Sequence, residues 1–180
     1  MNGLTLRVPD TSNAAEIASY RQELLDAGSS MDGCGTLRRR ADPLEWLDDN
    51  RKLSRRETLA LISPNWVVST QLVYVREADQ RIVGMIQIRH EFNEFLEKYA
   101  GHIGYSVRPS ERQKGYAKAM LAEALPLCRK IGLERVLICC IKGNEGSRRT
   151  ILANGGVYES TIFEPDEQVW LERYWIDLTA

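Results

Sequence analysis

The sequence lacks the features of membrane, secreted and nucleic-acid-binding proteins. Its longest uninterrupted apolar run is Val136–Ile141, far too short to cross a bilayer. Residues 1–10 lack the apolar core of a signal peptide. A formal net charge of −1 provides no general attraction to nucleic acid or to an anionic membrane. We therefore expect a cytoplasmic protein with neither nucleic acid nor membrane among its partners.

Metal-ligating side chains are scarce and poorly spaced. The chain has four cysteines and two histidines, and Cys34, Cys128, Cys139 and Cys140 form no C-x-x-C pair. Zinc would need histidine partners at ligand spacing, which are missing. We expect no metal site and interpret the cysteines as reduced packing residues of a cytosolic protein.

The usual glycine-rich nucleotide motifs are also absent. There is no G-x-x-x-x-G-K-[ST] and no G-x-G-x-x-G. Gly33-Cys34-Gly35 is not a dinucleotide fingerprint, because position 38 is arginine and no predicted strand precedes it. A nucleotide-binding fold of these types is therefore not predicted.

The composition is that of an ordinary globular protein, with 43% hydrophobic and 27% charged residues among 180. This length suits one domain, spanning 1–180, with one substantial core. Alternating and helical apolar periodicities predict seven strands and four helices. The expected strands are 4–8, 67–76, 81–89, 102–107, 135–141, 157–163 and 168–177. The expected helices are 13–26, a short helix that starts at Asp42-Pro43, 116–131 and 144–153.

Two details of these helices depend on single residues. Asp10-Thr11-Ser12-Asn13 offers several N-caps for the first helix, and Asn13 with Glu16 has the spacing of a capping box. Pro126 lies inside the third helix, where it should kink the helix or cost about 3 kcal/mol.

A strand, a tight turn and a helix at 102–133 organise the chain. The first amides of a helix have no intrahelical partners, and the helix dipole makes its N-terminus positive. Such a turn binds anions, and a diphosphate is a natural occupant. Gly115 allows close approach of a phosphate, while Arg112 and Lys114 can add charge from the side.

The spacing in this stretch resembles a known family. Residues Arg112–Ala117 fit R/Q-x-x-G-x-G/A, the pyrophosphate loop of the GCN5-related N-acetyltransferase (GNAT) superfamily. Val107-x-Pro109 upstream and Asn144-x-x-Ser147 downstream fall where that family places them. Within the superfamily, the chain is similar to a bacterial subgroup of predicted acetyltransferases. The resemblance is specific over about 100–160 and elsewhere follows the order of elements.

The resemblance implies a fold, a co-substrate and an activity. The α/β (α+β) fold would be a mixed, twisted sheet of about seven strands with helices on both faces. An acetyl group would pass from acetyl-CoA to a primary amine of a small molecule, a peptide or a protein, and a homodimer is expected. The alternative is a catalytically silent acyl-CoA-binding module.

The same resemblance assigns cofactor-binding positions. The pantetheine arm would lie between the strands ending at Val107 and Ile141, which should splay apart, and the main chain near Val107 would bond its amides. A main-chain N–H there could also stabilise the oxyanion of the intermediate. The diphosphate would be held by the loop, and the pantetheine side would be contacted by Asn144 and Ser147. The loop residues are Arg112, Gln113, Lys114, Gly115, Tyr116 and Ala117.

The catalytic positions depart from the family pattern. Many members have a base where this chain has Gly101 and Ile103, so His102 becomes the candidate base, although strand alternation directs it to the opposite face. The rivals are His90, Glu91, Glu94 and a water-mediated base. Many members have a proton-donating tyrosine where this chain has Ile151, and Tyr105 or Tyr158 could replace it.

The acceptor should lie against the segment 29–56, the hairpin at Ala78 and the closing hairpin. Four tryptophans are candidate walls of that cleft: Trp46, Trp66, Trp170 and Trp175. A basic cluster at 38–40, 51–52 and 55–56 is interleaved with acids. It is either a solvated surface or a site for an acidic acceptor feature or the 3′-phosphate of coenzyme A.

Overall fold

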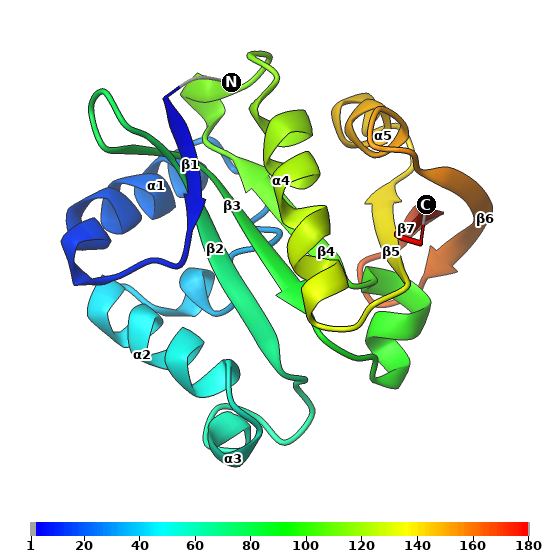
Figure 1. The fold of residues 1–180 in the computed structure, drawn as a ribbon, viewed down its shortest axis with the longest axis horizontal. Helices are drawn as coiled ribbons and strands as arrows, with labels where there is room; N and C mark the ends of the chain where they lie inside the picture. The colour runs from blue at the N-terminus through cyan, green and yellow to red at the C-terminus, as the bar shows by residue number, and fades with distance from the viewer. Residues whose placement is uncertain (1–2, 180) are drawn as a thin grey trace.

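The strands of the protein form two antiparallel sheets, as the computed structural model of residues 3–179 shows (Figure 1). The larger sheet has the order β1-β2-β3-β4, and the smaller has the order β5-β7-β6. The larger sheet consists of β1 Leu4–Arg7, β2 Ser69–Arg76, β3 Arg81–Arg89 and β4 Ile103–Val107. The smaller consists of β5 Arg135–Ile141, β6 Val157–Glu164 and β7 Val169–Asp177.

Helices cover both faces of the larger sheet (Figure 1). Helix α4 packs on one face, α1 and α2 pack on the other, and α5 packs against β5. The helices are α1 Ala14–Asp26, α2 Pro43–Leu53, α3 Arg56–Leu59, α4 Tyr116–Lys130 and α5 Glu145–Leu152. Short helical turns occupy Thr11–Asn13, Leu37–Arg39, Leu96–Ala100 and Pro109–Glu111.

Alternation along the central strands builds two hydrophobic clusters. On β2, Leu72 and Tyr74 join the cluster under α4, while Val73 and Val75 join the cluster under α1 and α2. The α4 cluster continues through Val136 and Ile138 of β5 into the smaller sheet. The α4 cluster therefore supports both sheets. With the second cluster on the other side, the central strands are buried on both faces.

The predicted fold is confirmed, with one refinement of the sheet. All seven predicted strands form, but they split into two sheets between β4 and β5 instead of making one continuous mixed sheet. The two strands meet at one end, where the His102 N–H donates to the Leu137 carbonyl at 2.8 Å and Gly101 bridges Ile138. Beyond this point they diverge, as the pantetheine arm between them would require.

Of the N-caps offered by residues 10–13, the structure uses Asp10. The Asn13 side chain accepts the Asp10 N–H, so the capping box joins Asp10 to Asn13, and the predicted pairing of Asn13 with Glu16 is wrong. The capping residue thus lies on the turn before α1. Helix α4 runs through Pro126 to Lys130, and Pro126 is exposed. The carbonyl deprived of its bond belongs to exposed Ala122, where water can replace the missing donor.

Candidate active site

The turn before α4 presents unpartnered main-chain N–H groups. In the described chain, the backbone amides of 113–118 donate to no protein acceptor. Gly115 caps α4 with φ of +80°, and Gln113 also has a positive φ of 62°. A left-handed backbone at these two positions turns successive N–H groups toward one side. This is the amide arrangement that a diphosphate would fill.

The turn is held by a buried arginine that sequence reasoning missed. Arg108 is fully buried and donates from Nη2 to Glu16 at 2.8 Å and from Nη1 to Glu23 at 3.1 Å. Its Nε donates to the Ile82 carbonyl at 2.8 Å. Glu23 also accepts the Ser110 N–H at 2.7 Å. Helix α1 is thereby fastened to the turn that follows β4.

Charged side chains of the loop are engaged by protein groups. Arg112 folds back, its Nε donating to the Val107 carbonyl at 3.2 Å, so it braces the end of β4. Lys114 pairs with buried Glu111 at 2.8 Å. Burial favours a raised pKa for Glu111, but hydrogen bonds from Lys114 and Arg76 outweigh it and lower that pKa. Both cations therefore lie beside the turn, and the charge of Lys114 is partly neutralised.

The main chain of β4 leaves one edge open toward β5. Arg108 donates to the Val83 carbonyl, and His102 accepts from the Arg89 N–H, so the even-numbered residues of this strand bond β3. In an antiparallel pair the alternate residues face the other way. The N–H groups of Tyr105 and Val107 consequently face the gap, where they have no partner within 3–179.

Three predicted site residues meet across that gap. Asn144 caps α5 by accepting the Ser147 N–H at 3.1 Å, and the Ser147 hydroxyl lies 2.8 Å from the Tyr105 hydroxyl. Tyr105 thus connects β4 to the first turn of α5. Burial raises the pKa of Tyr105, which keeps its hydroxyl protonated at neutral pH.

His102 closes the base of the gap. Its Nδ1 accepts the Leu137 N–H at 3.0 Å, and its ring lies against Phe92 with a centroid distance of 3.9 Å. Burial, together with the nearby Arg89 and Arg135 cations, lowers the pKa of His102 to about 4. The imidazole is therefore neutral at pH 7 with one nitrogen already used. This geometry favours a positioning role over that of a general base.

Two of the three rival bases, His90 and Glu91, are also engaged. The His90 Nε2 lies 2.8 Å from the Thr70 hydroxyl, and Glu91 forms an ion pair with Arg56 at 2.9 Å. Glu94 lines a separate, more open hollow together with Glu97 and Arg173. The remaining alternative is a base that acts through a water molecule, which would leave the contacts of His90 and Glu91 intact.

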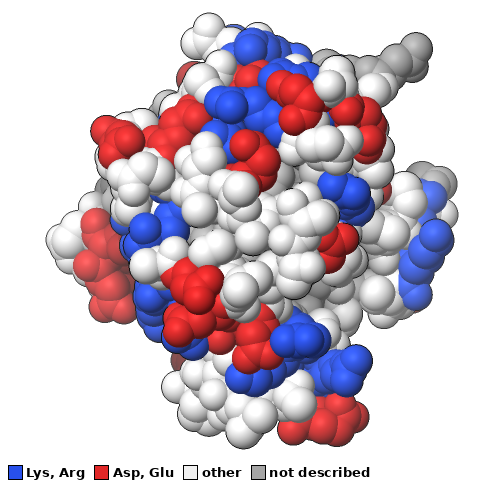
Figure 2. All heavy atoms as spheres, turned by 90° about the vertical axis from the view of Figure 1, so that its left-hand side faces the viewer, with Lys and Arg blue, Asp and Glu red and all other residues white. Residues whose placement is uncertain are grey.

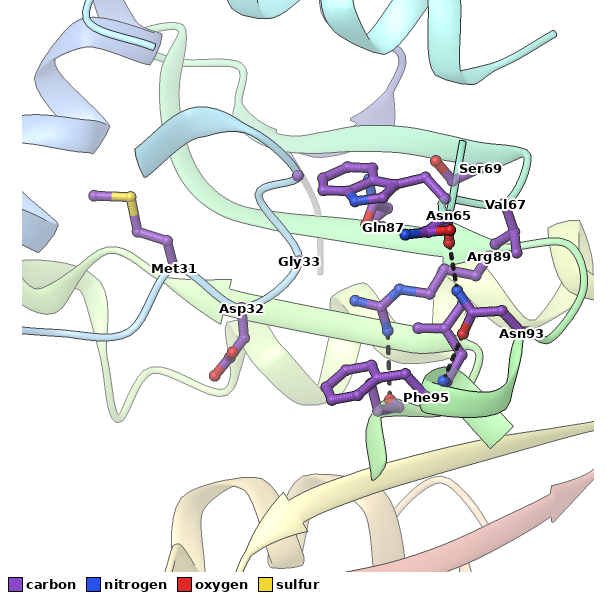
Figure 3. A pocket seen from close by; sticks show the side chains of 14 residues that line it. Met31, Asp32, Gly33, Asn65, Val67, Ser69, Gln87, Arg89, Asn93 and Phe95 are labelled. Atoms are coloured by element: carbon purple, nitrogen blue, oxygen red, sulfur yellow. Dashed lines mark hydrogen bonds between the residues drawn. The ribbon is translucent and has the colours of Figure 1, made fainter. Parts of the chain in front are cut away.

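A pocket of about 410 Å³ lies on the α1 side of β2 and β3 (Figure 3). Its wall includes the loop at Gly33, which crosses β4 at Gly104. Gln87 and Arg89, two residues apart on β3, contribute polar groups to it. The sequence carried a signal that we did not use, namely polar residues at alternate positions of an otherwise apolar strand.

Of the four tryptophans, Trp66 lines this pocket, whereas Trp46 is fully buried and donates from Nε1 to the Cys34 carbonyl. The basic cluster forms a surface of mixed charge on the α1 and α2 side (Figure 2). There Arg40 pairs with Asp49, and Arg51 pairs with Asp48. The exposed Arg51 pair favours the solvated-surface interpretation, whereas Asp49 is buried, so the Arg40 pair ties this surface to the interior.

None of the helices within 3–179 has the length and apolar character needed to cross a membrane. Across 3–179, no group of three or more His, Cys, Asp or Glu side chains is placed to hold a metal ion.

Several solved structures share the whole fold. The ribosomal-protein-S5-alanine acetyltransferase of Vibrio fischeri is 18% identical with a TM-score of 0.71, over 98% of this chain and 94% of that one. RimJ of Mycobacterium smegmatis, in complex with CoA-disulfide, is 21% identical with a TM-score of 0.70, over 97% and 81%. The yncA protein of Salmonella typhimurium, solved with its cofactor acetyl-CoA, is 15% identical with a TM-score of 0.66, over 98% and 95%.

Sequence comparison was informative at the level of the family. No curated protein matches the chain significantly. The model described as the acetyltransferase (GNAT) family matches residues 36–155, more than half of the 180 residues. The chain therefore belongs to the GNAT acetyltransferase family.

Proposed function

We propose that the protein transfers the acetyl group of acetyl-CoA to a primary amine of a small molecule or peptide. The observation that carries this proposal is the set of unpartnered amides at 113–118, placed beside the gap between β4 and β5. The amides suit a diphosphate, and the gap suits the extended pantetheine arm. The open N–H groups of β4 suit its amides and the oxyanion of the intermediate.

The site residues take the following roles in this proposal. The diphosphate is held by the loop residues Gln113, Lys114, Gly115, Tyr116 and Ala117. Arg112 braces the turn that these residues form. Val107 bonds the pantetheine through its main chain, and Asn144 with Ser147 supports the facing side. Tyr105 supplies the proton to the leaving thiolate, and His102 positions β4 against β5.

The wider setting is also proposed. Residues 1–180 act as one domain, as a homodimer, in the cytoplasm. All four cysteines are free thiols, in keeping with a reducing compartment. Gel filtration with light scattering measures the oligomeric state.

Free thiol release from acetyl-CoA in the presence of an amine panel tests the activity. We expect amine-dependent release, together with binding of acetyl-CoA in calorimetry. Binding without release for any amine would favour the catalytically silent module. Absence of binding would overturn the proposal.

A further inference from the structure

Arg89 is an arginine without a carboxylate partner in a pocket wall. Among the described lining residues it is the one cation, and within 3–179 it forms no ion pair. Its Nη1 donates to the carbonyls of Ala100 and Gly101 at 3.4 and 3.2 Å. Its Nε and Nη2 have no acceptor in the described chain, and neither is closed off from solvent. Nη1 is thus held by protein carbonyls, whereas Nε and Nη2 are available to a ligand.

The available half is aimed into the pocket. The Arg89 side chain extends from β3 across the pocket in Figure 3. Nη2 lies near the point where the Gly33 loop crosses β4. A Cβ built on Gly104 would be 3.2 Å from this nitrogen. Burial lowers the pKa of Arg89, and the charge of Asp32, which forms no ion pair with Arg89, opposes this effect only in part. The folded protein therefore holds the cation at a cost that a bound anion would relieve. A planar carboxylate matches two parallel N–H groups of a guanidinium.

The remaining walls restrict what else the occupant carries. Trp66, Val67, Phe95 and Leu96 give an apolar lining. Asp32 is the single acid among the lining residues; it accepts from the Ser30 hydroxyl at 2.8 Å and points away from Arg89 in Figure 3. A polycationic amine would meet repulsion from the guanidinium with little compensation.

We propose that the pocket binds an acceptor carrying both an amine and a carboxylate on an apolar body, as in an apolar amino acid, with Arg89 holding the carboxylate. This inference rests on the proposed function and names its substrate class. The Gly33 crossing brings the pocket next to β4, so an amine anchored by its carboxylate lies toward the gap. The nearby cation also favours the neutral amine, which is the nucleophilic form.

Calorimetry on the wild-type protein saturated with CoA tests this, using N-acetylphenylalanine and its carboxamide as probes. These molecules have the same apolar body and differ in the charged group. We expect the acid to bind at least about tenfold more tightly, as one charge-assisted pair implies. Equal binding, tighter binding of the amide, or no binding of either would overturn the inference.

Turnover provides the second readout. Phenylalanine, phenylalaninamide, phenethylamine and spermidine are compared by thiol release from acetyl-CoA. Arg89→Gln should raise KM for phenylalanine about tenfold or more and abolish the preference over the amide, with kcat changed less. Arg89→Lys should retain part of that preference. Lys130→Gln, which removes an exposed positive charge at the C-terminal end of α4, serves as the control. A preference for spermidine or phenethylamine in the wild type would overturn the inference.

The CoA titration separates the two levels of the proposal. If the wild-type protein did not bind CoA, the proposed function itself would be contradicted. CoA binding with no preference for the acid would contradict the acceptor class alone.

Discussion

Gly33 lies so close to Gly104 that a Cβ on Gly33 would stand 2.2 Å from the Gly104 carbonyl oxygen. Gly33 also has φ of +72°. This contact seats the loop over β4 and forms one wall of the pocket. Two glycines 71 positions apart (104 minus 33) thus set how near the pocket lies to β4.

Gly33→Ala should therefore displace the loop. We expect a loss of roughly 2 kcal/mol or more in the free energy of unfolding and a fall in kcat/KM for the acceptor, with CoA affinity retained. Gly28→Ala is the matched control, because Gly28 also has a positive φ, of 59°, but nothing within 4 Å of its Cβ. Urea unfolding and thiol-release kinetics measure both variants. Equal effects would show that backbone strain, and not the contact, is responsible.

Local patterns allowed most of the fold to be predicted, whereas long-range contacts were out of reach. Asp42-Pro43 predicted the start of α2 because capping depends on adjacent residues, and the Asp42 side chain does accept the Leu44 N–H. Arg108 and Arg89 were not predicted, because their partners come from distant segments of the chain. Arg108 has no local spacing that distinguishes it from a solvated arginine, and the one local signal of Arg89 is its alternation with Gln87 along an otherwise apolar strand.

Gly115→Glu should abolish CoA binding. A carboxylate at this position would occupy the anion site and would also strain a backbone with φ of +80°. Gly132→Glu is the matched control at the opposite end of the same helix, where φ is +92° and the Cβ has open space. We expect similar destabilisation of both variants but loss of calorimetric CoA binding in the first alone. Equal CoA affinities would contradict the placement of the diphosphate.

Tyr105→Phe should lower kcat about 10- to 100-fold while changing CoA affinity less than about twofold. The substitution removes the proton donor but keeps the aromatic packing. Ser147→Ala removes the hydroxyl that lies 2.8 Å from Tyr105 and leaves the donor in place, so its effect should be smaller. An unchanged kcat in Tyr105→Phe would indicate that the thiolate leaves without this acid.

Arg108→Met should cost about 3 kcal/mol in the free energy of unfolding, because the Ile82 carbonyl loses its partner and the tie between α1 and the turn is broken. Arg51→Met removes an exposed ion pair with Asp48 and should cost less than about 0.5 kcal/mol. Urea denaturation followed by circular dichroism compares the two. Similar small losses would mean that the buried network contributes little.

His102 should make stability depend on pH between about 6.5 and 4. Its pKa is about 4 in the folded protein and near the ordinary value of 6.5 in the unfolded chain. In this window the unfolded chain binds the proton and the folded protein does not, so stability falls as the pH falls, by about 3 kcal/mol. Below pH 4 both states are protonated and the loss ends.

His102→Asn isolates this contribution. The Asn Oδ1 can accept the Leu137 N–H as Nδ1 does, but it does not titrate. Unfolding measured at several pH values should therefore give curves for wild type and variant that approach each other as the pH drops from 6.5 to 4. Parallel curves would contradict the lowered pKa. Activity distinguishes the two roles of His102 at pH 8, where the imidazole is neutral. If kcat of the His102→Asn variant were more than about 100-fold below that of the wild type, His102 would be the general base.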